Sequence, residues 1–189
     1  MVDQVRIEGA VRTILEAIGE DPTREGLVAT PRRIAEMYAE LFSGLHQDPR
    51  EFLRGGFEEE QRGMVVLRDI PFYSMCEHHF LPFYGVAHVG YVPERRVVGI
   101  SKIARALDAL SHRPQLQERL TRQLAEVIED TLRPAGVGVI LEATHLCMVM
   151  RGVKKPGSLI VTSAHRGLFL SDTRAREEFL ALVRGNRPA

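Results

Sequence analysis

One short window, residues 72–82, holds the most reactive cluster of the chain. A metal site built on it needs a further ligand from a distant segment. Cys76, Glu77, His78 and His79 place a thiol, a carboxylate and two imidazoles in consecutive positions. Such groups bind metal ions and transfer protons near neutral pH. Cys76 and His79 form a Cys-x-x-His pair, the spacing with which a tight turn brings a thiolate and an imidazole onto one zinc ion. Two ligands do not complete a metal site, so another part of the chain must fold against this window.

The only other cysteine, Cys147, is the candidate for a third ligand. The β-prone composition around it, bounded by glycines, predicts a buried strand over residues 137–150. Residues two apart on a strand face the same side, about 6.5 to 7 Å apart, so His145 and Cys147 would face the same space. If Cys147 reaches the metal, three protein ligands leave the fourth position open, with His78 and His145 nearby. That pattern is typical of a catalytic zinc ion and not of a structural one.

Other interpretations of these residues stay open at this point. A lone cysteine is more often an inert buried residue than a ligand, and a His-His pair is a weak signal. Cys76 and Cys147 could instead form a disulfide. The N-terminal residues lack a secretory signal pattern, however, and intracellular thiols are normally kept reduced. Metal binding is therefore the favoured interpretation.

Length and charge limit the class of protein. A chain of 189 residues suffices for one domain with a real core, with or without a helical extension. The 25 basic and 25 acidic residues balance, which argues against a general nucleic-acid binder. No apolar run approaches the roughly 18 residues of a membrane span. We expect a soluble, cytoplasmic protein with no nucleic-acid or membrane partner.

Hydrophobic periodicity predicts helices first and a mixture of strands and helices afterwards. Helices are expected over residues 3–18 and from Thr30, as N-cap, to Gly44. From Gly63 the spacing of apolar residues changes from that of helices to that of extended strands. Strands are then expected over residues 64–70, 82–92, 96–100, 137–150 and 159–163, and helices from residue 101 and over 114–132 and 173–183. Strands 82–92 and 96–100 are expected to form a hairpin. This order predicts an α+β fold with a mainly antiparallel sheet, and no P-loop or Rossmann fingerprint is present.

Two groups of charged residues have both a functional and an ordinary explanation. Lys102 and Arg105 share a face at the start of a helix with Ser101 as the expected N-cap, which could cradle a phosphate. Glu118 could accept two parallel hydrogen bonds from a planar edge such as that of guanine. On these residues alone, solvated cations and a surface pair between Glu118 and Arg122 explain the pattern at least as well.

The segments 74–79 and 142–148 together resemble GTP cyclohydrolase I. Further segments resemble the family in the family's order over nearly the whole chain: 21–27, 30–33, 99–102, 117–121 and 133–137. The resemblance implies a tunnelling fold with helices on one side of an antiparallel sheet. Subunit sheets would join into a barrel, and two pentameric rings would stack as a homodecamer with sites at subunit interfaces. It also implies an N-terminal helical region, 1–62, and a catalytic domain, 63–189.

The resemblance implies a hydrolase reaction in which GTP and water give 7,8-dihydroneopterin triphosphate and formate, the first step of tetrahydrofolate biosynthesis. By position, Cys76, His79 and Cys147 would bind Zn²⁺. His78 and His145 would be the acid-base pair. Zinc lowers the pKa of bound water from 15.7 to roughly 7 for attack at C8 of the purine. His78 would protonate N7, and His145 would move protons as the rings open.

The same resemblance gathers the undecided residues into one pocket. Glu118 would read guanine, with Gln117 and the backbone near Ser101. The remaining contacts would be to the triphosphate, from Lys102, Arg105 and Arg151, and from Arg33 reaching into a neighbouring subunit's site. A lysine often stands near the position of Glu36 in the family, so this glutamate argues against a phosphate contact there.

Two alternative functions follow from the same residues. One keeps the fold and the metal but acts on another pterin or purine; the cations predicted for the triphosphate argue against it. The other is a zinc and nucleotide-binding protein without turnover. An open fourth metal position beside His78 argues against this second alternative, and a fourth protein ligand would support it.

Overall fold

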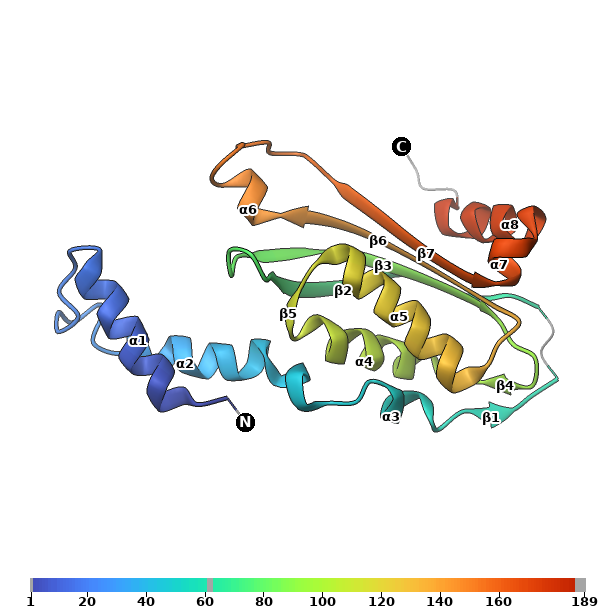
Figure 1. Ribbon diagram of the computed structural model, residues 1–189, viewed down its shortest axis with the longest axis horizontal. Helices are drawn as coiled ribbons and strands as arrows, with labels where there is room; N and C mark the ends of the chain where they lie inside the picture. Colours follow the sequence, from blue (N-terminus) through green and yellow to red (C-terminus); the bar gives the residue numbers. More distant parts are fainter. Residues whose placement is uncertain (1, 61–62, 186–189) are drawn as a thin grey trace.

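The computed structural model describes residues 2–60 and 63–185, and its centre is a five-stranded sheet of order β5-β2-β3-β6-β7 (Figure 1). The strands are β2 (Val65–Cys76), β3 (Pro82–Val92), β5 (Pro114–Gln115), β6 (Gly136–His145) and β7 (Ile160–Gly167). All neighbours are antiparallel except β5, which runs parallel to β2. The mainly antiparallel sheet predicted from the sequence is confirmed.

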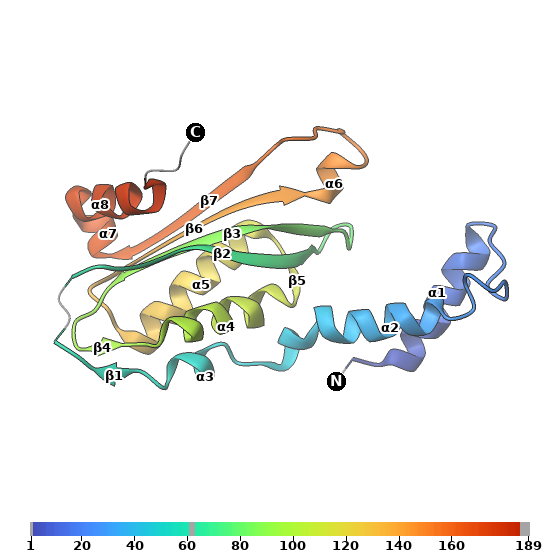
Figure 2. The same ribbon diagram turned by 180° about the vertical axis from the view of Figure 1, so that it is seen from behind.

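Two helices, α4 (Ile100–Ser111) and α5 (Gln117–Leu132), cover one face of this sheet, as both ribbon views show (Figures 1 and 2). Their apolar stripes pack on the alternate residues of β3 and β6 that point to the same side. Leu120, Leu124 and Ile128 of α5 are fully buried there. Burial of each such side chain contributes about 1.5 to 3 kcal/mol, so this layer is the main core.

The opposite face carries the C-terminal helices α7 (Leu168–Ser171) and α8 (Thr173–Arg184) at one end of the sheet. Phe179 of α8 is fully buried. It lies against Gly90 and Gly138, where an added Cβ would be 2.6 and 2.7 Å from the ring. The two glycines therefore leave the space that the ring fills. The resemblance implied helices on one side of the sheet, and α8 adds a second, smaller core on the other.

The variant Phe179→Ala is expected to lower the free energy of unfolding by about 3 to 5 kcal/mol, because it leaves a cavity beneath α8. Urea unfolding followed by circular dichroism measures this change. Leu182→Ala removes a partly exposed side chain from the same helix and is the matched control. A loss as small as that of the control would contradict the anchoring role of Phe179.

His165 of β7 lies against the ring of Phe179, with ring centroids 6.3 Å apart. Burial lowers the pKa of His165, and Arg176 lowers it further. Because the unfolded chain then binds the proton more tightly, stability should fall as the pH drops below about 6.5, the ordinary histidine pKa. His165→Phe should reduce the loss of urea midpoint between pH 7 and pH 5. An unchanged pH dependence would contradict this assignment.

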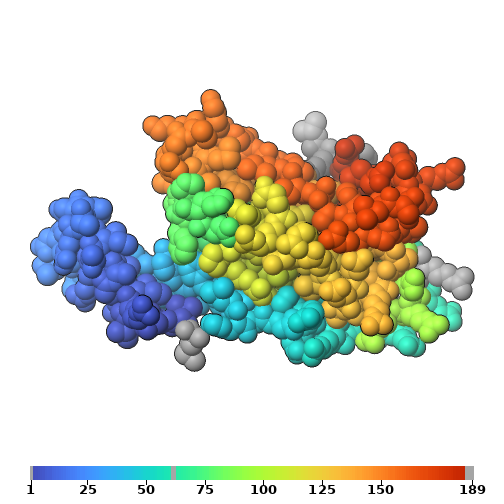
Figure 3. Space-filling view, viewed as in Figure 1, coloured from blue at the N-terminus to red at the C-terminus, as the bar shows by residue number. Residues whose placement is uncertain are grey.

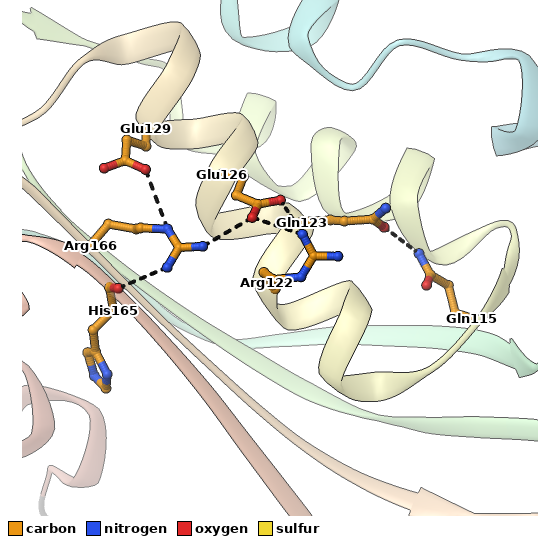
Figure 4. Close-up of polar contacts among 7 residues, drawn as sticks. All are labelled: Gln115, Arg122, Gln123, Glu126, Glu129, His165 and Arg166. Carbon is orange, nitrogen blue, oxygen red and sulfur yellow. Dashed lines mark hydrogen bonds and ion pairs between the residues drawn. The ribbon is translucent and has the colours of Figure 1, made fainter.

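Arg166, the next residue of β7, joins this strand to α5 (Figure 4). Its guanidinium lies 3.1 Å from Glu126 and 3.4 Å from Glu129, and Arg122 also binds Glu126 at 2.9 Å. Partly exposed pairs of this kind contribute little stability, about 0 to 1 kcal/mol each. The network therefore serves mainly to fix where α5 lies over the edge of the sheet.

The N-terminal helices α1 (Gln4–Ala17) and α2 (Thr30–Leu41) pack on each other and project from the body of the protein (Figures 1 and 3). The chain then returns along α4 and α5 through η1 (Ser43–His46), α3 (Arg50–Leu53) and β1 (Phe57–Glu58). The division between residues 62 and 63 falls at the gap in the described residues and stays a prediction. Within residues 2–60 and 63–185, no helix is long and apolar enough to cross a bilayer.

The hairpin predicted between residues 82–92 and 96–100 is wrong. Only β4 (Arg96–Val97) is extended in the second of these segments, and it pairs with β1 and not with β3. Arg96 donates to the carbonyl oxygen of Gly56 at 2.6 Å, which draws the segment towards the returning chain. The partner strand comes from a distant part of the sequence, so local periodicity could not identify it.

Several predicted boundaries also differ from the structure. The N-cap positions are Ala29 and Gly99, one and two residues before the predicted Thr30 and Ser101. The first strand continues to Cys76, and α5 begins at Gln117, not at residue 114. The strand predicted over 137–150 ends at His145, and the chain turns into the short helix α6 (Leu146–Val149).

Candidate active site

The Cys-x-x-His pair lies in the loop that joins β2 to β3. Cys76 is the last residue of β2, and its N–H donates to the carbonyl of Leu81 at 2.9 Å. The N–H of Phe80 donates back to the carbonyl of Cys76 at 2.9 Å, and Phe80 has a left-handed φ of 51°. These bonds close a tight turn, which brings the side chain of His79 close to the thiol of Cys76.

Cys147 reaches the same place because β6 pairs with β3. His145, the last residue of β6, stands opposite Phe83 in the ladder, and the chain then turns into α6. The possible ligand atoms of Cys76, His79 and Cys147 all lie within 4.8 Å of one another, and both cysteines are free thiols. The structure thus brings the three predicted metal ligands together. The route differs from the predicted one, because Cys147 is on a helical turn and does not alternate with His145 along a strand.

The electrostatics of this group fit a bound cation. Burial raises the pKa of the Cys147 thiol, and the neighbouring Cys76 raises it further. A divalent ion offsets both effects, because it binds the thiolate and releases the proton. Two sulfurs and an imidazole are a donor set that zinc prefers, and among the described residues the group consists of these three. Such a set leaves a fourth coordination position for water or substrate.

The two predicted acid-base histidines have different surroundings. His78 is exposed, with its ring 6.2 Å from that of His79. His145 is partly buried and stacks on Phe83, with centroids 4.6 Å apart and planes 8° apart. Burial lowers the pKa of His145, and the charge of Glu118 partly offsets this. At neutral pH His145 is therefore mainly an uncharged imidazole, able to accept a proton.

An ion pair between Glu77 and Arg119 ties the metal loop to α5. Arg119 binds both carboxylate oxygens of Glu77, one of them at 3.0 Å, and this hydrogen bonding lowers the pKa of Glu77. The N–H of Glu77 also donates to the carbonyl of Gln115 at 3.0 Å. Sequence reasoning missed this pair. The two residues are far apart in the chain, and no local pattern indicates that they meet.

Arg119→Met is expected to weaken metal binding and lower activity by at most the roughly 10- to 100-fold that loss of a direct partner of a metal ligand costs, because Glu77 adjoins Cys76 but is not itself a ligand. Competition with a chromogenic chelator measures the affinity. Arg122→Met is the matched control, since Arg122 lies on the same helix but pairs with Glu126. Equal effects of the two substitutions would show that the ion pair does not support the metal loop.

The remaining residues predicted to contact the substrate fall into two groups. The first group lies near His145 and Cys147. Gln117 and Glu118 open α5 beside His145, and Arg151 follows α6 closely enough for its charge to lower the pKa of Cys147. Arg122 pairs with Glu126, so the surface pair considered for Glu118 is replaced by another.

The other predicted contacts lie elsewhere in the chain. Ser101, Lys102 and Arg105 lie in the first half of α4, whose last turn leads to β5 beside Cys76. A helix of this length spans about 18 Å, so these residues begin at the far end from the metal loop. Arg33 is exposed on the projecting α2, where Glu36 pairs with Arg32 at 3.5 Å. Within one chain, the length of α4 thus separates Ser101 from the metal loop, whereas Phe80 of that loop contacts Tyr38 of α2.

The fold and the site define an α+β protein with two thiols and an imidazole that could hold a metal ion, next to two further histidines. The family model of GTP cyclohydrolase I matches residues 7–184. The chain is 57% identical over 188 residues to GTP cyclohydrolase 1 of Caldanaerobacter subterraneus subsp. tengcongensis, covering 99% of this chain and 100% of the relative. It is 58% identical over 185 residues to that of Dehalococcoides mccartyi, covering 97% and 98%. The chain belongs to the GTP cyclohydrolase I family, and its sheet and helices are those of the tunnelling fold.

Proposed function

We propose that this chain hydrolyses GTP at C8 of the purine with the help of Zn²⁺, releases formate and forms 7,8-dihydroneopterin triphosphate, the first step of tetrahydrofolate biosynthesis. One observation carries this proposal: the ligand atoms of Cys76, His79 and Cys147 lie within 4.8 Å of one another, in a chain of this family. Zinc bound there would act as a Lewis acid and lower the pKa of its water towards about 7. The reaction belongs in the cytoplasm, where GTP is available.

The residues around the metal group supply the proton transfers. His145, uncharged and held against Phe83, accepts a proton as the purine and ribose rings open. His78, exposed in the same loop, is free to donate one to N7 of the purine. Relief of negative charge at N7 is needed when a nucleophile adds to the neighbouring carbon. The two histidines thereby divide the acid and base roles.

Substrate selection rests on charges placed around this centre. Glu118 is exposed in the first turn of α5 and offers a carboxylate to the N1–H and exocyclic amine of guanine. Arg151, whose charge acts on Cys147, would contact the triphosphate. Gln117 was predicted to read guanine with Glu118, and its buried side chain bonds to the carbonyl of Leu141 and to His145.

The length of α4 between its first residues and the metal loop supports an assembly that completes the site. Ser101, Lys102 and Arg105 would serve a neighbouring subunit's metal centre, as would Arg33 on α2. Large side chains on the sheet are exposed in the single chain, as expected for a surface that another copy covers: Tyr73, Tyr84 and Val161. We propose a homodecamer of two pentameric rings, and native mass spectrometry would distinguish it from a monomer or a single ring.

Metal analysis tests the central part of this proposal. The purified chain should contain one zinc per subunit, and X-ray absorption should show two sulfur ligands and one imidazole with a further light atom. A fourth ligand from the protein would instead indicate a structural metal site and would overturn the catalytic role. Absence of zinc binding by the purified chain would also overturn it.

A further inference from the structure

The side chain of Gln117 is 1% exposed and lies beneath the ladder between β6 and β7. Its nitrogen Nε2 is 3.0 Å from the carbonyl oxygen of Leu141 and 3.0 Å from that of Ile160. It is also 3.1 Å from Oγ1 of Thr162. Carbonyl oxygens only accept hydrogen bonds, so the NH₂ group of the amide must face them. The orientation of the amide is therefore determined by its surroundings.

Two threonine hydroxyls support the same orientation. Thr121 Oγ1 donates its only proton to the backbone carbonyl of Gln117 at 2.7 Å. The hydroxyl of Thr162, 2.6 Å from that of Thr121, must then be the donor of that pair. Its own lone pairs remain for the NH₂ group of Gln117. The donor and acceptor roles of both threonine hydroxyls therefore agree with the same orientation of the Gln117 amide.

The other end of the amide faces His145. With Nε2 of Gln117 turned to the carbonyls, Oε1 lies 2.8 Å from Nε2 of His145. An amide oxygen only accepts, so this ring nitrogen must carry a proton. In the uncharged imidazole the lone pair is then on Nδ1. Stacking on Phe83 holds the plane of the ring.

We infer that Gln117 is a positioning residue that holds His145 in the Nε2–H tautomer, so that Nδ1 is the atom with which His145 accepts a proton. The inference rests on the proposed function only for the catalytic role of His145. It replaces the predicted reading of guanine by the Gln117 side chain. In the other tautomer Nδ1 would carry the proton and could not accept one.

The tautomer can be measured without turnover. Magic-angle-spinning NMR of the zinc-loaded, sedimented protein with labelled histidine distinguishes Nε2–H from Nδ1–H by the nitrogen shifts, and the signal of His145 is the one missing from His145→Asn. We expect Nε2–H in the unaltered chain and in the control Thr162→Val, which keeps both carbonyl acceptors. Gln117→Met should give the other tautomer or a mixture. Nδ1–H in the unaltered chain, or an unchanged tautomer in Gln117→Met, would overturn the inference.

Kinetics with GTP then separate positioning from substrate binding. Gln117→Met should lower kcat by about 10- to 100-fold with little change in KM, as expected for loss of an orienting partner. A rise in KM with kcat unchanged would return Gln117 to a guanine-binding role and overturn the inference. If the unaltered chain has the Nε2–H tautomer but releases no formate, the proposed function and the catalytic role of Nδ1 fall, while the tautomer assignment stands.

Discussion

Cys147→Ala is expected to abolish metal binding and to lower formate release from GTP by about 10³-fold or more. Metal assistance provides several kcal/mol of transition-state stabilisation, and each 1.36 kcal/mol is about a tenfold change in rate. Cys147 is the only one of the three ligands that comes from outside the β2–β3 loop. Without it, Cys76 and His79 form an incomplete pair, which is not expected to retain zinc against a chelator.

Zinc content and formate release, measured on the same preparations, test this prediction. Met150→Ala changes an exposed residue just after the same short helix and should leave both values unchanged. Circular dichroism would show whether the fold is kept. A Cys147→Ala protein that still carried one zinc per subunit and turned over GTP would show that the metal group is wrongly assigned.

His145→Ala should lower kcat by about 10² to 10⁴-fold, the range for loss of a general acid or base, while zinc content stays unchanged. The proposed metal ligands are other residues, so chemistry and not metal binding should fail. His78→Ala should have an effect of the same order for a different step. The exposed His78 is assigned to protonation of N7, and the partly buried His145 to the later ring openings.

Analysis of accumulated intermediates distinguishes the two histidines. His78→Ala should stall before the imidazole ring of the purine is opened. His145→Ala should allow a ring-opened species to accumulate. If both variants stalled at the same intermediate, the division of roles would be wrong, although both residues would remain catalytic.

The Cys76 and His79 part of the metal group could be predicted from sequence because its signal is local. The Cys-x-x-His spacing predicted a turn, and the loop between β2 and β3 provides it. The position of Cys147 was predicted by a geometric argument that proved wrong. Periodicity indicated one strand through residue 150, but the chain leaves the sheet after His145. A strand end followed by one helical turn gives no distinct pattern in apolar residues.

The contacts that organise the site could not be predicted, because they depend on how α5 lies against the sheet. Arg119 meets Glu77, and Gln117 meets His145, only after the helix is packed beneath β6 and β7. A glutamine and an arginine in the first turn of α5 look like ordinary polar residues in sequence. The buried amide becomes meaningful only when its three acceptors are known.

A GTP turnover assay on the purified protein, with zinc, after chelation, and after zinc is restored, tests the central claim most directly. Formate release and the absorbance of the pterin product are followed together. The account predicts that both appear with zinc, disappear on chelation and return with the metal. Formate release that persisted at full rate in metal-free protein, or GTP binding without formate in zinc-loaded protein, would contradict it.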